Sequence, residues 1–225
     1  MRVIAEKTRR SRGRPPIRPD EETRHLIIEA ASLEFRANGY ASTSMAAVAQ
    51  RAGVSTKTMY RLIPTKEDLF KSMVSERIGR FMLAVDETVV GTVELEAALE
   101  RILCAYGSLA LDSEVIATTR LVISESDRFP ELGKAFSEGA LKRTTEAIES
   151  WLRRQREAGL LVLSDPAVAA DMLRGMMVME PQRAVMLGQR HPLDADEIAT
   201  RARICASLFL NGCRPSDRPT AEALK

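Results

Sequence analysis

The amino-acid sequence predicts an all-α protein, and two observations carry that prediction. The first is composition: aromatic residues make up 4% of the chain and hydrophobic residues 45%, with Ala, Leu and Met abundant. Such a mixture favours helices over sheets. The second is periodicity, because apolar residues recur every three to four positions and no segment alternates as a strand would. We therefore expect helix after helix and no β-sheet.

The first predicted helix begins at Asp20, whose side chain can cap it. Ile28, Ala31 and Phe35 fall on one face of this helix at the spacing of a buried stripe. We expect Gly39 to end the helix in a left-handed conformation, which glycine adopts without steric cost.

Two short helices follow. Ser44 is the expected N-cap of one, which stops near Gly53, where a tight turn forms. The other opens at Ser55 or Thr56 and ends at Pro64, because the residue before a proline disfavours helical geometry. Two short helices joined by a glycine-containing turn are typical of a DNA-binding helix-turn-helix, whose second helix enters the major groove.

Small and basic side chains follow the glycine turn. Thr56, Lys57, Thr58 and Arg61 lie on the outer face of the third helix, where they can reach base edges or phosphates. Lys66 stands at the start of the next helix, where the positive end of the helix dipole disfavours a lysine. That locally unfavourable position indicates that Lys66 contacts a phosphate.

From Lys66 to the C-terminus we expect longer helices, at residues 66–88, 93–110, 113–126, 131–158, 166–187 and 195–210. Pro181 should kink or split the helix that contains it. The predicted organisation is therefore a disordered basic arm at residues 1–19, a helix-turn-helix domain at 20–65, a helical-bundle domain at 66–213 and a tail at 214–225.

Positive charge is concentrated at the N-terminus. Residues 1–18 hold seven Arg or Lys and one Glu, whereas the net charge of the whole chain is +2. Such an arm suits a polyanionic partner. Arg12-Gly13-Arg14-Pro15 also matches the core of an AT-hook, in which arginines enter the narrow minor groove of A·T-rich DNA. A generic basic tail without sequence preference is the alternative.

Several classes of protein are not indicated. Apolar runs are too short to cross a bilayer, and no apolar segment follows the basic N-terminus, so we expect a cytoplasmic protein with no membrane partner. Cys104, Cys205 and Cys213 fit neither a zinc site nor a disulfide framework. His25 and His191 lack a second ligand at metal spacing. Without a nucleophile elbow or phosphate loop, we expect no metal, no cofactor and no enzymatic activity.

Residues 24–70 resemble the TetR (tetracycline repressor) family of bacterial transcription regulators. The residues that carry the resemblance are Ile28, Ala31, Phe35, Gly39-Tyr40, Ser44, Val48-Ala49, Ala52-Gly53-Val54-Ser55, Met59-Tyr60 and Pro64-Thr65-Lys66-Glu67-Asp68-Leu69. The stretches Leu121–Glu125 and Phe129–Leu132 look like the family's subgroup of multidrug-efflux regulators. Leu62 and Ile63 depart from the family's usual aromatic residues but remain apolar.

The resemblance implies roles for particular positions. Thr56, Lys57 and Thr58 occupy base-reading positions, and Arg61 lies where either base or backbone is read. Ser44, Tyr60 and Lys66 occupy positions that meet phosphates. The location it implies is the bacterial cytoplasm, in association with the nucleoid.

The resemblance also implies a ligand pocket and a two-fold dimer in the helical domain. The pocket candidates are Phe81, Tyr106, Leu121, Trp151, Met172 and Met176, each of which would serve equally as core packing. The last two helices are the expected interface, with candidates Val168, Met172, Ile198, Ala202, Cys205 and Phe209. A two-fold dimer binds a roughly palindromic operator.

The sequence therefore predicts a ligand-responsive transcriptional regulator that binds double-stranded DNA as a homodimer. We expect a repressor that a small apolar or amphipathic effector releases from a palindromic operator. One alternative is an architectural protein that binds A·T-rich DNA with little sequence preference. Another is a helical enzyme with an accessory DNA module. A specificity ratio near one between operator and random duplex would indicate the architectural class.

Overall fold

The computed structural model describes residues 18–86 and 94–213, apart from the side chain of Arg80. Every regular element in those ranges is helical, as the sequence predicts. Arg12 and Arg14 of the basic arm lie outside the described residues, as does the C-terminal tail. None of the helices in the described ranges combines the length and apolar character needed to cross a membrane.

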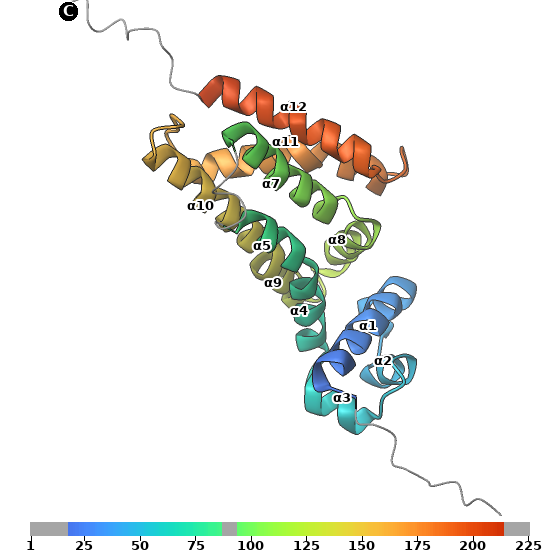
Figure 1. Ribbon diagram of the computed structural model, residues 1–225. Helices are drawn as coiled ribbons and strands as arrows, with labels where there is room; N and C mark the ends of the chain where they lie inside the picture. Colours follow the sequence, from blue (N-terminus) through green and yellow to red (C-terminus); the bar gives the residue numbers. More distant parts are fainter. Residues whose placement is uncertain (1–17, 87–93, 214–225) are drawn as a thin grey trace, which may run out of the picture.

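The N-terminal helices form a small unit at one end of the molecule (Figure 1). It consists of α1 (Asp20–Ser42), α2 (Met45–Arg51) and α3 (Thr56–Leu62), with α4 (Lys66–Arg77) packed against them. Phe35, Val48, Met59 and Phe70 are fully or almost fully buried in its core. Because α4 supplies part of this core, the hydrophobic unit extends past the predicted domain boundary at residue 66.

Local hydrogen bonds begin two short helices where the sequence predicts, at Ser44 and Ser55, and Thr65 begins α4 in the same way. The side chains of Ser44, Ser55 and Thr65 each accept a hydrogen bond from the backbone N–H three residues later, at 3.1, 3.1 and 3.0 Å. Asp20 differs from its prediction, because it is the first residue of α1 and makes no capping hydrogen bond. Its carboxylate instead binds Arg61 of α3.

The remaining helices form the larger unit at the other end of Figure 1. They are α5 (Gly79–Val85), α7 (Leu95–Ala110), α8 (Ser113–Glu125), α9 (Pro130–Phe136), the π-helical segment η1 (Ser137–Lys142), α10 (Arg143–Glu157), α11 (Pro166–Met186) and α12 (Ala195–Cys213). Their core contains Leu99, Ile102, Trp151, Leu173 and Ala202. α12 packs along α7, and α10 packs along α11.

Two predicted helices differ from the structure. The helix expected at 66–88 is broken at Ile78, which separates α4 from α5 just before Gly79, a poor helix former. α11 runs through Pro181 without splitting. A proline removes the N–H that would bond to the carbonyl four residues earlier. Here that carbonyl, of Met177, accepts a hydrogen bond of 2.7 Å from Nε of Arg201 on α12, so the lost bond is replaced.

Two glycines hold the left-handed conformations expected of them. Gly53 has φ +66° in the turn between α2 and α3, and Gly39 has φ +74° and ψ 171° near the end of α1. The conformation of Gly39 is one that almost only glycine adopts. A Cβ there would also lie 2.8 Å from Oε1 of Glu125, whereas a Cβ at Gly53 would have no neighbour within 4 Å.

We expect Gly39→Ala to destabilise the protein more than Gly53→Ala does. The control substitution at Gly53 should cost about 1–2 kcal/mol, the cost of a left-handed conformation for a residue with a Cβ. Gly39→Ala adds the displacement of Glu125. Urea unfolding of both variants would measure the difference, and equal losses would show that Glu125 places no constraint on this turn.

Candidate DNA-binding surface and effector cavity

The outer face of α3 is open to solvent. Thr56, Lys57 and Arg61 are exposed, and Tyr60 is 52% exposed despite its size. Thr58 is half-buried, and its hydroxyl lies 2.9 Å from that of Ser55, the helix N-cap. Met59 and Leu62, on the opposite face, are buried in the core and fix the orientation of the helix. α3 thus presents polar side chains outward at the end of the molecule (Figure 1).

Arg61 has a partner that sequence reasoning missed. Its two terminal nitrogens each donate to the Asp20 carboxylate at 2.7 Å. The hydrogen bond between the two side chains lowers the pKa of Asp20 and raises the pKa of Arg61. Both side chains are more than half exposed, and exposed ion pairs contribute little free energy. Separating Arg61 from Asp20 would therefore cost little free energy.

The helix that supports α3 is fixed from within. Glu34 of α1 is buried, and its carboxylate accepts a hydrogen bond of 2.5 Å from Nε of Arg51 at the end of α2. That hydrogen bond holds the pKa of Glu34 below its ordinary value. At the other end of α2, Ser44 is exposed. Its position is compatible with the phosphate contact that remains a prediction for it.

Lys66 makes contacts that the sequence did not predict. Its ammonium donates to the carbonyl oxygens of Tyr40 at 2.7 Å and Thr43 at 2.9 Å, and lies 4.4 Å from the centre of the Tyr40 ring. Burial lowers its pKa. These carbonyls give a reason within the chain for a lysine at this position, beside the phosphate contact that the helix dipole indicates. A phosphate contact for Lys66 stays a prediction.

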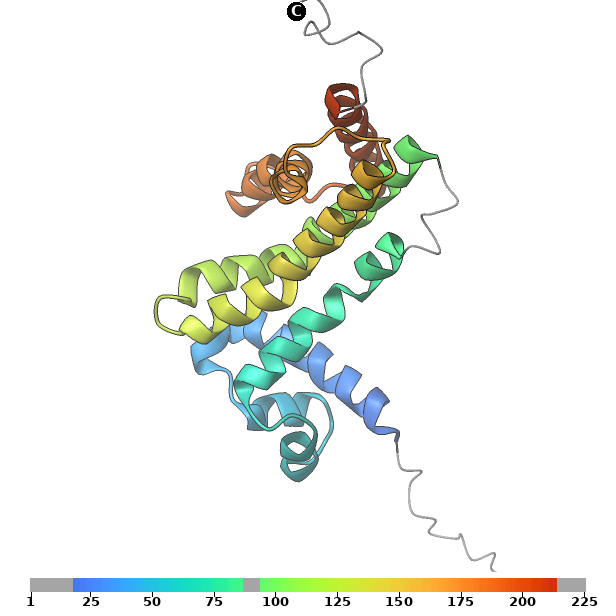
Figure 2. The same ribbon diagram turned by 90° about the vertical axis from the view of Figure 1, so that its left-hand side faces the viewer.

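Glu125, at the end of α8, binds the backbone N–H groups of the turn whose carbonyl oxygens Lys66 binds. Its two carboxylate oxygens accept hydrogen bonds from the backbone N–H groups of Tyr40 at 2.8 Å and Ala41 at 3.1 Å. The ring of Phe129 packs against that of Tyr40, with centroids 5.2 Å apart, and burial raises the pKa of Tyr40 to about 12. Figure 2 shows the connection between α8 and α9 lying against the end of α1.

Sequence reasoning assigned no role to Glu125, although a signal was present. An acidic residue at the C-terminal end of a helix is electrostatically unfavourable. The same type of signal drew attention to Lys66. In both cases the unfavourable local charge indicates a partner elsewhere in the chain.

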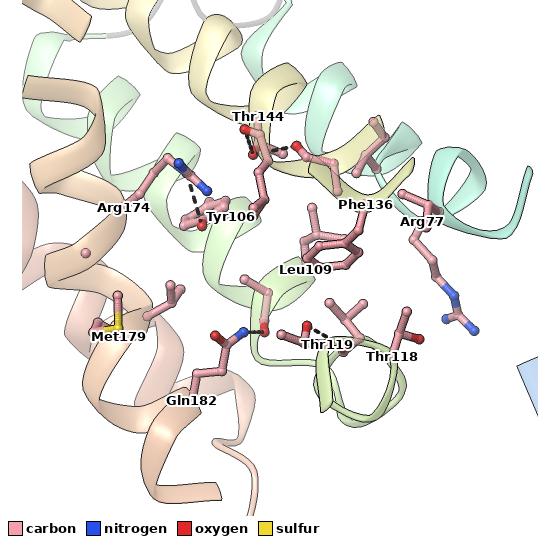
Figure 3. A pocket seen from close by; sticks show the side chains of 18 of the residues that line it. Arg77, Tyr106, Leu109, Thr118, Thr119, Phe136, Thr144, Arg174, Met179 and Gln182 are labelled. Atoms are coloured by element: carbon pink, nitrogen blue, oxygen red, sulfur yellow. Dashed lines mark hydrogen bonds between the residues drawn. The ribbon is translucent and has the colours of Figure 1, made fainter. Parts of the chain in front are cut away.

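A cavity of about 420 Å³ lies between α4, α7, α8, η1 and α11 (Figure 3). Its walls are largely apolar, with a few polar side chains. The apolar part includes Met73, Ile78, Leu109, Phe136, Val178 and Met179, and the polar part includes Tyr106, Thr118, Thr119, Thr144, Arg174 and Gln182. Pockets that bind small molecules commonly measure about 300–1,000 Å³ and have this composition.

Most of the predicted pocket residues lie elsewhere. Of the six candidates, Tyr106 lines this cavity. Phe81 and Trp151 are packed in the core of the larger unit, and Leu121 packs against the N-terminal core. Met172 is 63% exposed, and Met176 lines a shallow hollow beside α12. These five do not line this cavity, because apolar residues at helical spacing fill cores as readily as they line cavities, and a ligand contact for them stays a prediction.

The dimer stripe predicted on α12 lies largely inside the chain. Ile198, Ala202 and Cys205 are buried in the core that α12 forms with α7, and Phe209 is half-buried against it. The exposed apolar residues of α12 are Ile204 (54%) and Leu208 (62%). On α11, the predicted residues Val168 and Met172 are exposed, at 48% and 63%. An apolar face is therefore available on both helices.

Comparison with known proteins adds two matches to family models. Residues 27–73 match the model described as bacterial regulatory proteins of the tetR family. Residues 97–212 match the model of the C-terminal domain of AefR-like transcriptional repressors. Together the two models cover most of the helix-turn-helix unit and most of the helices around the cavity.

Individual relatives agree with these models. The fatty acid metabolism regulator protein of Bacillus subtilis is 28% identical over 102 residues, which cover 45% of this chain and 53% of that protein. This chain therefore spans about half the length of that relative. A regulator structure from Mesorhizobium loti, described as TetR-family, has a TM-score of 0.75 at 26% identity and covers 88% of this chain and 100% of that one. The flavonoid-responsive regulator FrrA has a TM-score of 0.68 at 27% identity, covering 87% and 98%.

Lys66→Ala and Lys57→Ala should separate the two roles considered for Lys66. Because Lys66 holds the end of α1, its loss should lower the thermal stability, and the phosphate contact predicted for it should reduce the slope of log affinity against log salt by about one charge. Lys57 is exposed and is predicted to read bases, so its replacement should keep stability and lower the affinity for operator. Thermal unfolding and binding titrations at several salt concentrations measure both. An unchanged slope in Lys66→Ala would restrict Lys66 to its structural role at the end of α1.

Proposed function

The chain belongs to the TetR family of bacterial transcriptional regulators, and on that basis we propose that it is a repressor released from its operator by a small molecule in the cavity. One observation carries this proposal. The cavity is lined by residues of α4 and α8, and these two helices hold the turn at Tyr40 and Ala41 through Lys66 and Glu125. A change in the cavity wall is thus connected to the end of α1.

On DNA, we assign α3 to the major groove. Thr56 and Lys57 are exposed at its start and suit contacts with base edges, as Thr58 does once its hydroxyl leaves Ser55. Tyr60 and Ser44 are exposed on either side and suit phosphates. Arg61 contacts base or phosphate after leaving Asp20. The arginines of the basic arm, Arg12 and Arg14, are assigned to the adjacent minor groove on their sequence alone.

For release, we propose a population shift between two orientations of the N-terminal unit. The effector binds more tightly to the orientation in which the recognition helices of a dimer no longer match successive major grooves. Operator affinity then falls by the ratio of the effector's affinities for the two states. Lys66 and Glu125 transmit the movement, because each bonds directly to the backbone of the turn.

The dimer that this mechanism needs is assigned to the outer faces of α11 and α12. Val168 and Met172 on one helix, and Ile204 and Leu208 on the other, leave apolar side chains about half or more exposed. Burying such a face in a two-fold interface removes apolar surface from water. The two recognition helices would then bind half-sites one helical turn apart.

The proposed function is tested by selecting binding sites from random duplexes and measuring specific and non-specific affinity. We expect an inverted repeat and a specificity ratio of at least about 10³. Leu208→Glu should give a monomer by analytical ultracentrifugation and lose operator affinity. Leu83→Glu, at a residue 67% exposed on α5, is the control and should change neither. A specificity ratio near one would contradict the assignment as a sequence-specific repressor. A dimeric Leu208→Glu protein would contradict the proposed interface.

Glu125→Gln should weaken the coupling between cavity and operator. The amide keeps one acceptor oxygen but places an NH2 group against a backbone N–H. The amphipathic dye 1-anilinonaphthalene-8-sulfonate can probe the cavity with and without operator DNA. In the wild-type protein we expect operator to reduce dye affinity, within the factor of about 5–150 typical of allosteric coupling. In Glu125→Gln, operator DNA should leave the dye affinity almost unchanged.

Asp127→Asn provides the matched control for this measurement. Asp127 is exposed two residues after Glu125, so its replacement removes the same charge without touching the turn. It should keep the wild-type coupling factor. Equal factors in the wild type and Glu125→Gln would remove Glu125 from the mechanism.

A further inference from the structure

Arg174 is a charged side chain in the wall of an otherwise largely apolar cavity. It projects from α11, and its side chain is 15% exposed. Removing a guanidinium from water costs free energy unless its N–H donors find acceptors. The partners of its five donors therefore indicate what the cavity is built to hold.

Three of those donors have partners in the protein. Nε donates to the hydroxyl oxygen of Tyr106 at 3.2 Å, and Nη1 donates to Thr145 Oγ1 at 2.5 Å and to Asp171 Oδ1 at 3.2 Å. The guanidinium carbon also lies 5.5 Å from the centre of the Tyr106 ring. Within residues 18–86 and 94–213, Nη2 has no hydrogen-bond acceptor. Two N–H donors of a largely buried cation thus remain for a ligand.

Tyr106 adds a third donor beside them. Its hydroxyl oxygen accepts from Arg174, so its own hydrogen is left to donate. Burial raises the pKa of Tyr106, which keeps the hydroxyl protonated at neutral pH. Figure 3 shows the two side chains together on one side of the cavity, from α11 and α7. This Arg174–Tyr106 pair forms a cluster of donors.

Most of the uncharged polar groups of the cavity use their donors elsewhere. The hydroxyls of Thr118, Thr119 and Thr144 donate to backbone carbonyls one helical turn earlier. The amide of Gln182 uses one of its two N–H donors on the carbonyl of Ala110, at 2.9 Å. The donors of a largely buried cation are therefore those of Arg174, with the Tyr106 hydroxyl beside them.

The formal charges of the cavity wall favour an anion at this pair. Arg77, on the opposite side of the view in Figure 3, forms an ion pair with Glu114. Asp171 is the carboxylate nearest to Arg174, and its side chain is 68% exposed, so solvent screens its charge. A largely buried cation facing a screened carboxylate retains attraction for a second anion.

We propose that the cavity binds an amphipathic carboxylate, whose carboxylate group accepts hydrogen bonds from Nη2 of Arg174 and the hydroxyl of Tyr106. The apolar body lies against Leu109, Phe136 and Val178, in a volume of about 420 Å³. This inference rests on the proposed function, because it names the chemical class of the effector. A charge-assisted hydrogen bond in a desolvated site is stronger than a neutral one.

The test compares dodecanoate with dodecanol on the full chain, by displacement of 1-anilinonaphthalene-8-sulfonate and by calorimetry. We expect dodecanoate to bind at least about 10-fold more tightly, the gain from one charged hydrogen bond. Arg174→Gln should reduce dodecanoate affinity about 10- to 100-fold and leave dodecanol affinity unchanged. Arg183→Gln is the matched control, because Arg183 is an exposed arginine of the same helix paired with Glu180.

Two further variants keep the proposal falsifiable if Arg174→Gln fails to fold. Tyr106→Phe removes one donor and should weaken dodecanoate about 2- to 10-fold, the range for one hydrogen bond. Asp171→Asn removes the competing carboxylate and should strengthen dodecanoate binding. A merely structural role for the Asp171–Arg174 contact predicts the opposite change for Asp171→Asn, and that result would overturn the proposal.

The outcomes also separate this proposal from the proposed function. If the ligand-free chain binds its operator specifically but dodecanol binds as tightly as dodecanoate, the carboxylate assignment is wrong and the repressor assignment stands. If dodecanoate binds through Arg174 but neither the free nor the bound chain selects an operator, the repressor assignment is wrong and the binding site stands.

Discussion

The arrangement of the two units depends on how one turn of backbone is hydrogen-bonded. At Gly39 the regular path of α1 ends, and the peptide groups of Tyr40 and Ala41 lose their helical partners. Tyr40 is buried, and a buried peptide group must be paired, or its desolvation is uncompensated. Lys66 donates a hydrogen bond to the carbonyl oxygen of Tyr40. Glu125 accepts hydrogen bonds from the backbone N–H groups of Tyr40 and Ala41. These two side chains come from the helices that also form the cavity wall, so the orientation of α1 is tied to the cavity.

Hydrophobic packing reinforces that connection. Val122 of α8 and Leu132 of α9 belong to the same apolar cluster as Phe35, Phe70 and the other core residues of the N-terminal unit. The helix-turn-helix, α4 and the ends of α8 and α9 therefore form a continuous packed body. Packed interiors resist gradual deformation, so α1 is expected to follow α4 and α8 as a rigid element. The break at Ile78, where α4 meets α5, is a place where the chain already departs from regular helix.

Features fixed by neighbouring residues were predictable from the sequence, and features fixed by distant partners were not. The caps at Ser44, Ser55 and Thr65 act over three residues, and the turn glycines act on their own backbone, so local patterns predict them. Glu125 lies about 85 residues from its partners, and no local pattern gives that pairing. The stripe containing Ile198 was recognised as apolar, but periodicity does not tell whether another helix of the same chain or a second chain covers it.

The cavity can be coupled to operator binding in two ways, through α4 and α8 or through α11 and the proposed dimer interface. One face of α11 contributes Arg174 and Val178 to the cavity, while Met172 on the helix is exposed where the dimer is proposed. A ligand in the cavity would therefore act on the proposed dimer interface as well as on α4 and α8. Methionine side chains adapt to small shifts, so an interface that contains them absorbs part of a movement of α11. The hydrogen bonds of Lys66 and Glu125 to backbone atoms have narrow geometric limits. In the proposed mechanism, movement of α4 and α8 would consequently reach the recognition helix more directly than movement of α11.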